Sequence, residues 1–161
     1  MQEALSLTPQ AQGQILVVED DEMFRDYLEE FLNDSGFSAK VVENAPAARE
    51  IFLKNPFDLV ITDLNMPGGD GFELCQWIKK EKESTPVILI TGYSEVGNSE
   101  KALKAGVSQF LEKTDVRKNL IESIQSCMKI VEESNSSDVK ALDLKRLLAG
   151  QDFLFDLFFR N

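Results

Sequence analysis

The stretch FDLVITDLNMPGGDGFEL, residues 57–74, runs a buried strand directly into an aspartate and then into a turn. The four residues before Asp63 have the apolar and β-branched character of the inside of a sheet. A strand that ends at the surface would explain Asp63 on its own, because an acidic residue costs little there. Strand ends of an open parallel sheet, however, gather in one crevice. The other strand ends therefore decide whether Asp63 belongs to a site.

The composition is that of a soluble globular protein with one domain and some additional chain. The 161 residues are 43% hydrophobic and 9% aromatic, which is enough for a proper core. The 17 basic and 28 acidic residues give a formal charge of -11, which opposes the attraction to phosphates on which nucleic-acid binding depends. We therefore expect no nucleic-acid partner.

Cysteine and histidine usage excludes several classes of site. The chain has no histidine, so a Ser-His-Asp or Cys-His nucleophile is excluded. Cys75 and Cys127 each fall within a helical pattern, and two isolated cysteines cannot supply a zinc site. We expect both to be reduced thiols, buried or half-buried in the core.

The N-terminal segment lacks the features of a targeting signal. Residues 1–13 have no basic segment followed by an apolar core, and no later run approaches the length of a membrane span. The segment also shows no periodicity, which predicts a disordered leader. We expect a cytoplasmic protein without membrane insertion.

Short apolar runs alternate with helical patterns from Gln14 onward. The apolar runs predict five strands, QILVV (14–18), SAKVVE (38–43), DLVITD (58–63), VILIT (87–91) and QFLEK (109–113). The helical patterns lie at 21–36, after a cap at Asn44, and at 72–82, 98–105 and 116–132. The pattern at 98–105 has the weakest apolar face, so we expect it to be the most mobile helix. This alternation predicts a doubly wound α/β fold, a five-stranded parallel sheet with five flanking helices.

Four of the five predicted strands end in polar groups. These are Glu19, Asp20 and Asp21 after the first strand, Asp63 after the third, Thr91 in the fourth and Lys113 after the fifth. Singly, Asp21 reads as a helix cap, Thr91 as a turn residue and Lys113 as a solvated charge. Together, carboxylates in one crevice repel each other unless a cation neutralises them, and oxygen ligands favour Mg²⁺ or Mn²⁺. A lysine and a hydroxyl on the opposite rim suit the oxygens of a phosphoryl group.

Residues 14–132 resemble the receiver domain of bacterial two-component response regulators. The segments that carry the resemblance are ILVVEDDE (15–22), ITDLNMPGGDG (61–71), VILITG (87–92) and AGVSQFLEKT (105–114). The resemblance implies a flavodoxin-like fold with strand order 2-1-3-4-5. It also implies that Asp63 accepts a phosphoryl group from a histidine kinase or a histidine phosphotransfer protein.

The same resemblance implies roles for the other site residues. Asp63, Asp20 and the backbone carbonyl of Asn65 would hold the metal, and Glu19 would act on it largely through water. Thr91 and Lys113 would bind the phosphoryl oxygens. Phe110 matches the aromatic position that reorients together with the threonine on activation.

The implied output is a protein contact rather than catalysis. The domain would assist only its own phosphorylation and dephosphorylation, so it is not an enzyme acting on other substrates. Phosphorylation would shift the surface formed by residues 98–105, 109–113 and 116–132 and control binding of a downstream protein target, without a DNA-binding output. A homodimer could form through this surface or through the C-terminal tail. The alternatives are a scaffold that works without phosphorylation and, less favoured because Asn65 lacks a carboxylate, a magnesium-dependent phosphohydrolase.

Three positions leave alternatives open. Thr114 follows Lys113 where the family usually has proline, so the bond is either cis, at about 2.5 to 4 kcal/mol, or takes a different trans path. Asn65 and Tyr93 occupy positions that vary in the family and are thought to set phosphoryl lifetime. Asn65 could orient an attacking water, whereas Tyr93 could shield the group from it.

The C-terminal part of the chain is the least typical. Residues 133–138 are polar and predict a linker, and residues 139–161 predict a helical tail rich in phenylalanine. This tail is too short for an independent DNA-binding domain, so another surface must cover its apolar face. It could fold back on the receiver, close a homodimer or dock another protein. The chain could also be a fragment of a longer protein.

Overall fold

The computed structural model describes residues 11–92 and 99–135. The predictions for residues 1–10, Tyr93, 136–138 and the tail at 139–161 therefore lie outside the described residues.

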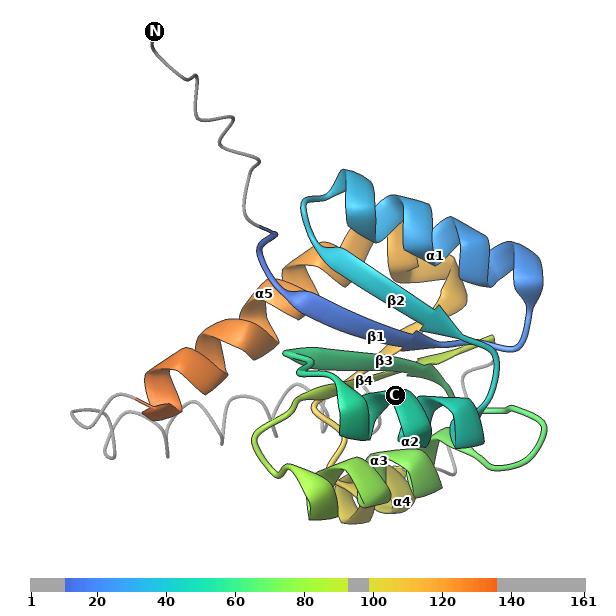
Figure 1. Cartoon of the computed structure of the whole chain (residues 1–161), viewed down its shortest axis with the longest axis vertical. Coiled ribbons are helices and arrows are strands. Elements are labelled where there is room, and N and C mark those ends of the chain that lie inside the picture. The colour runs from blue at the N-terminus through green and yellow to red at the C-terminus, as the bar shows by residue number, and fades with distance from the viewer. Residues whose placement is uncertain (1–10, 93–98, 136–161) are drawn as a thin grey trace, which may run out of the picture.

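All strands of the sheet run parallel. The sheet has the order β2-β1-β3-β4-β5, as predicted. Its strands are β1 (Gln14–Val18), β2 (Ser38–Val42), β3 (Leu59–Asp63), β4 (Val87–Thr91) and β5 (Gln109–Glu112). Figure 1 shows them as one twisted layer through the middle of the domain. The chain passes from β1 to β2 at the edge of the sheet and then to β3 on the other side of β1. The strand order therefore reverses between β1 and β3, which is where doubly wound folds place their ligands.

Helices cover both faces of the sheet (Figure 1). One face is covered by α1 (Glu22–Asp34) and α5 (Val116–Asn135), and the other by α2 (Ala45–Lys54), α3 (Gly71–Glu81) and α4 (Ser99–Ala105). Ile15 and Val17 of β1 pack with the α1 and α5 side, whereas Leu16 and Val18 pack with the other. This alternation follows from the two-residue period of a strand. The doubly wound fold with five flanking helices is thus confirmed.

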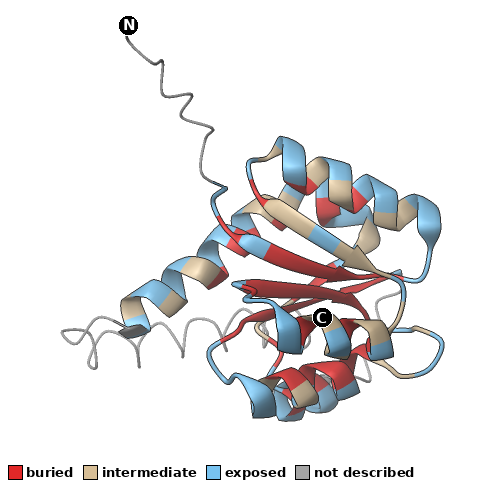
Figure 2. Cartoon of the chain, viewed as in Figure 1, coloured by how far each residue is buried: buried red, intermediate tan, exposed pale blue. Residues whose placement is uncertain are grey.

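The central strands are buried on both faces, whereas β2 at the edge is only partly buried (Figure 2). Strands buried on both sides need continuous apolar runs, which is why these segments could be recognised in the sequence. The polar side chains that interrupt the runs are therefore confined to the strand ends.

Short polar side chains begin three of the helices. Asp21 accepts a hydrogen bond from the Phe24 amide, and Asn44 accepts one from Ala47, which confirms both predicted caps. Asp70 accepts from the Glu73 amide at the start of α3. Each cap satisfies an amide that the first helical turn leaves without a partner.

Two domain boundaries differ from the predictions, besides shifts of one or two residues at the ends of individual strands and helices. Helix α5 continues to Asn135, so residues 133–135, expected to be linker, are helical. At the other end, residues 11–13 were expected to be part of a disordered leader. They are joined to the domain instead, because the Gln12 amide donates to the Gly36 carbonyl and the Gly13 carbonyl accepts from Ser38.

Both cysteines are free and buried, as predicted. Burial raises the pKa of Cys75 to about 12 and that of Cys127 to about 11. Both are therefore neutral packing residues at ordinary pH. Within the described residues, no helix is both long and apolar enough to cross a membrane.

Candidate functional site

The site lies at the carboxyl edge of the sheet, where the predicted strand ends meet. Glu19 and Asp20 follow β1, and Asp63 is the last residue of β3, the neighbouring strand. One carboxylate oxygen from each residue lies within 4.8 Å of the other two. The structure therefore brings the three predicted acidic residues together.

Lys113, which directly follows the edge strand β5, contacts this acidic cluster. Its Nζ atom lies 3.1 Å from Asp63 Oδ2 and 3.1 Å from Glu19 Oε2. Burial lowers the pKa of Lys113, but hydrogen bonds and attraction from Glu19 and Asp63 outweigh this and raise the pKa overall. The ammonium group is therefore charged throughout the physiological range and bridges two of the three carboxylates.

The backbone after Lys113 follows the trans alternative. The bond to Thr114 is not cis, and residues Lys113–Asp115 form the short 3-10 turn η2 that leads into α5. This turn has no side-chain cap. Lys113 reaches the acidic cluster from this trans path.

Glu19 is the most deeply buried member of the cluster, with 1% of its surface exposed. Its Oε1 atom accepts a hydrogen bond from the Asp21 amide at 3.1 Å. Burial raises the pKa of Glu19 to about 7, and the charge of Asp63 adds to this rise, while the Asp21 amide and Lys113 oppose it. A cation beside Glu19 would favour its charged form.

Asp63 is also buried, and its environment is formed by the loop that follows it. The Asn65 amide lies 3.3 Å from Asp63 Oδ1, while the Asn65 side chain is exposed. The metal-binding role of the Asn65 carbonyl stays a prediction. At Gly71, an added Cβ would lie 2.5 Å from the Asp63 carbonyl oxygen and 2.5 Å from Leu89 Cδ2. Only glycine therefore lets α3 start this close to the acidic strand end.

Thr91 and Phe110 are both buried. Thr91 ends β4, the strand beside β3, and is fully buried. Phe110 lies in β5 and packs into the core on the α2, α3 and α4 side. Their predicted roles as switch residues are not tested by these positions.

Two residues of α1 contact the site and were not predicted to do so. Phe24, expected only as an inward helix residue, lies with its ring centroid 4.8 Å from Lys113 Nζ. Arg25 donates from Nη1 to the Glu19 carbonyl at 2.9 Å and to that of Asp20 at 3.3 Å. Their position directly after the acidic motif was the only signal available in the sequence.

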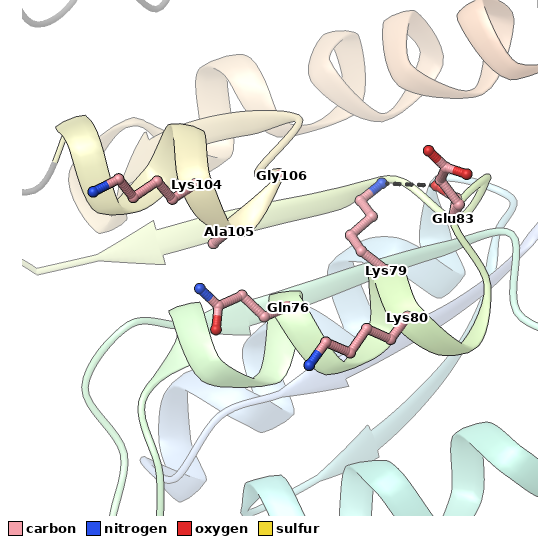
Figure 3. Close-up of a pocket in the computed structure, with 7 residues that line it drawn as sticks. All are labelled: Gln76, Lys79, Lys80, Glu83, Lys104, Ala105 and Gly106. Atoms are coloured by element: carbon pink, nitrogen blue, oxygen red, sulfur yellow. Dashed lines mark hydrogen bonds between the residues drawn. The ribbon is translucent and has the colours of Figure 1, made fainter.

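A separate cavity of about 700 Å³ lies between α3 and α4 (Figure 3). Its lysines do not form a second charged site, because their amino groups point in different directions. Lys79 donates to the carbonyls of Glu83 and Thr85, and Lys104 pairs with Glu100. The lining residues lie at the end of α3 and α4, toward the opposite edge of the sheet from the acidic cluster.

The fold and this site define a class of protein. Three clustered carboxylates suit a divalent cation that prefers oxygen ligands, and the adjacent ammonium group suits an anionic partner. Both lie at the carboxyl edge of a flavodoxin-like sheet, the usual ligand position of this fold. The class is therefore a flavodoxin-like domain that carries an acidic crevice suited to a divalent cation.

Comparison with known proteins identifies the family within this class. The profile of the response regulator receiver domain matches residues 15–125, and the chain belongs to this family. It is 31% identical over 138 residues to the transcriptional regulatory protein FixJ of Bradyrhizobium diazoefficiens, covering 86% of this chain and 67% of FixJ. It is 38% identical over 98 residues to the response regulator protein PilR of Pseudomonas aeruginosa, covering 61% of this chain and 22% of PilR. The chain thus spans only part of the length of these curated relatives.

Solved receiver structures agree with the fold. The response regulator TrrA of Thermotoga maritima, solved in complex with Mg²⁺ and BeF, is 32% identical with a TM-score of 0.66, covering 71% of this chain and 97% of TrrA. A CheY-like receiver domain protein of Methanospirillum hungatei is 25% identical with a TM-score of 0.72, covering 76% of this chain and 98% of the other. The phosphorylation and signal transduction of this chain are implied by its family.

Proposed function

We propose that Asp63 accepts a phosphoryl group from a phosphohistidine of a histidine kinase or phosphotransfer protein, and that this modification switches binding of a downstream protein. The observation that carries the proposal is the placement of Lys113 Nζ 3.1 Å from Asp63 Oδ2, inside a cluster of three carboxylates. A lone surface aspartate would have neither the ammonium partner nor the acidic neighbours.

The chemistry would consist mainly of positioning and charge neutralisation. An oxygen of Asp63 attacks phosphorus as the bond from phosphorus to the histidine nitrogen breaks, and the product is an aspartyl phosphate. The transition state is loose, with charge spread over the phosphoryl oxygens. Lys113 neutralises part of this charge, and the Asn65 amide at 3.3 Å holds the acceptor carboxylate in place.

The acidic cluster would hold the cation that the reaction needs. Asp20, Asp63 and the Asn65 carbonyl are the proposed direct ligands, and Glu19 would act largely through water. Mg²⁺ fits this set best, because all donors are oxygens and one carboxylate is exposed enough to leave room for waters. The bound ion would neutralise charge on the phosphoryl oxygens. The structure of TrrA in complex with Mg²⁺ and BeF supports this choice of ion.

The proposed output is a change of packing beside the site. A phosphoryl group on Asp63 adds acceptor oxygens that attract the Thr91 hydroxyl, and Phe110 repacks toward the space that the threonine vacates. The surface of α4, β5 and α5 would change as a result. The changed surface would act through protein contacts in the cytoplasm. Direct binding to nucleic acid is disfavoured by the net charge of -11.

Intact-mass measurement tests the proposal. The purified protein would be treated with acetyl phosphate and Mg²⁺ beside the Asp63→Asn variant. A single phosphoryl adduct that the variant lacks is the expected result. If the wild type took no adduct from acetyl phosphate or from a histidine kinase, the scaffold that works without phosphorylation would replace this proposal.

A further inference from the structure

Lys113 contacts an aromatic ring as well as two carboxylates. Its Nζ atom lies 4.8 Å from the centroid of the Phe24 ring, over the ring. A cation at this distance is attracted by the negative face of the ring. The side chain of Lys113 remains 27% exposed, so water has access to the ammonium group. The Phe24 ring limits the movement of this group on one side.

The Phe24 ring is itself held in place. The Phe24 amide donates to the Asp21 cap at 2.8 Å, which positions the residue in the first turn of α1. The ring stacks on Tyr27 with centroids 5.9 Å apart, and Tyr27 stacks on Phe31 at 5.7 Å. Three rings are therefore stacked along α1, and the stack supports the Phe24 ring, which contacts Lys113.

The backbone at Lys113 is held less firmly than the Lys113 side chain. The residue begins the uncapped turn η2, and the following Thr114 is exposed. The position of the amino group therefore depends on Glu19, Asp63 and Phe24. Two of these three contacts are carboxylates that would also face a divalent cation, which would compete with the lysine for their charge. The neutral ring is the contact that such a cation would leave unchanged.

We propose that Phe24 is a positioning residue, whose ring holds the Lys113 ammonium beside Asp63 when a cation occupies the acidic cluster. This inference rests on the proposed function, since the lysine is useful there only if it meets a phosphoryl group. In this proposal, Phe24 of α1 positions the charge of Lys113, which lies in the turn after β5.

The contact itself can be tested without phosphorylation. In an NMR spectrum of the metal-free protein, the ε-methylene protons of Lys113 should be shifted upfield by the ring. The shift should disappear in Phe24→Leu and persist in Phe24→Tyr and Phe24→Trp. Phe52→Leu is the matched control, because it removes a ring of α2 that packs on Phe57 and Trp77 rather than on Lys113 or Phe24. An unshifted methylene signal in the wild type would overturn the inference.

The functional consequence is tested by the rate of phosphorylation with acetyl phosphate and saturating Mg²⁺. Phe24→Leu should slow the reaction by roughly three- to tenfold, the factor that corresponds to one partly exposed cation–π contact. Phe24→Tyr should restore the rate, and Phe52→Leu should leave it unchanged. Phe24→Met provides a second ring-free variant of similar size if Phe24→Leu does not fold.

A double-mutant comparison separates positioning from a general structural effect. In a Lys113→Met background, Phe24→Leu should cause no further loss of rate, because there is no ammonium left to hold. An equal loss in both backgrounds would overturn the inference. Absence of any adduct on the wild type would instead refute the proposed function, while the NMR result would still decide whether the ring holds the lysine.

Discussion

Glu19 illustrates how burial controls the charge of a single residue. Its pKa is raised to about 7 by burial and by the charge of Asp63, against the opposing effects of the Asp21 amide and Lys113. The folded protein therefore binds a proton at Glu19 that the unfolded chain has already lost between pH 4.5 and 7. The stabilisation from this proton is complete below pH 4.5 and is lost as the pH rises through 7.

We predict that the metal-free protein becomes less stable between pH 5 and pH 8. The Glu19 contribution to the free energy of unfolding is up to roughly 3 kcal/mol, at 1.36 kcal/mol per unit of pKa. Urea unfolding in EDTA measures this change. Glu19→Gln should remove most of the difference between the two pH values, because its side chain does not titrate. An equal pH dependence in both proteins would show that the burial of Glu19 does not control it.

The same carboxylate predicts how cation binding depends on pH. A divalent cation needs the acidic cluster in its charged form, so Mg²⁺ affinity should rise as the pH increases through 7 and then level off. Titration calorimetry at several pH values measures this profile. If Mg²⁺ affinity did not change between pH 6 and 8, the charge of Glu19 would not control cation binding.

Asp20 should contribute more directly to cation binding. Its side chain is exposed and lies within the same cluster, so Asp20→Asn should fold normally and lose at least about tenfold in Mg²⁺ affinity, since even outer-shell changes cost 10–100-fold. Asp26→Asn, an exposed change in α1 outside the cluster, is the matched control. Unchanged affinity in Asp20→Asn would remove this residue from the proposed ligands.

The acidic residues and Lys113 could be predicted because each follows an apolar strand in the sequence. The contact between Lys113 and Phe24 could not, since it joins α1 to the loop after β5 and depends on side-chain directions in the folded protein. Periodicity marked Phe24 as an inward helix residue but did not indicate its partner. Long-range contacts of this kind depend on side-chain directions, which strand positions and strand order do not give.

At the scale of elements, the start of α3 is tied to the end of β3. The Gly71 amide donates to the Leu64 carbonyl at 2.8 Å, and the space beside Gly71 is filled by the Asp63 carbonyl and the Leu89 side chain. We predict that Gly71→Ala lowers the free energy of unfolding by about 1 to 3 kcal/mol through overpacking. It should also slow phosphorylation of Asp63 by displacing the end of β3.

Chemical unfolding of Gly71→Ala beside Gly92→Ala checks this prediction. An added Cβ at Gly92 would meet no atom within 4 Å, and the Gly92 φ angle is not in the left-handed region, so its stability should change little. Equal stability of the two variants would contradict the steric argument.

The strands could be predicted more closely than the helix ends. The central strands are buried on both faces and have continuous apolar sequences, which leave little freedom in their limits. The end of α5 lies among polar residues, where helix and linker have similar sequences. The helix continues there to Asn135, past its expected end at Glu132. Polar residues at the end of an amphipathic helix therefore say little about where it stops.

At the scale of the whole molecule, the described residues include the five strands and five helices of the receiver fold. Helices cover both faces of the sheet, and each strand is paired with its neighbours among the described residues. We predict that a chain ending at Asp138 unfolds cooperatively at nearly the same urea concentration as the full chain. It should also take the same phosphoryl adduct at Asp63.

Circular dichroism during urea unfolding, with intact-mass analysis of the phosphorylated samples, measures both properties. A markedly lower midpoint for the shorter chain would show that residues 139–161 stabilise the domain. A change only in sedimentation would assign them to association between molecules.

The hydrogen bond between Lys113 and Glu19 joins residues 94 positions apart, and it closes a site whose parts come from the beginning, middle and end of the domain. During synthesis, Glu19 and Asp63 leave the ribosome long before Lys113 does. A nascent chain that stops short of β5 therefore carries the proposed acceptor aspartate without the lysine that is proposed to assist its reaction. Under the proposed function, phosphorylation of Asp63 would therefore be efficient only in a chain that has been made and folded beyond β5.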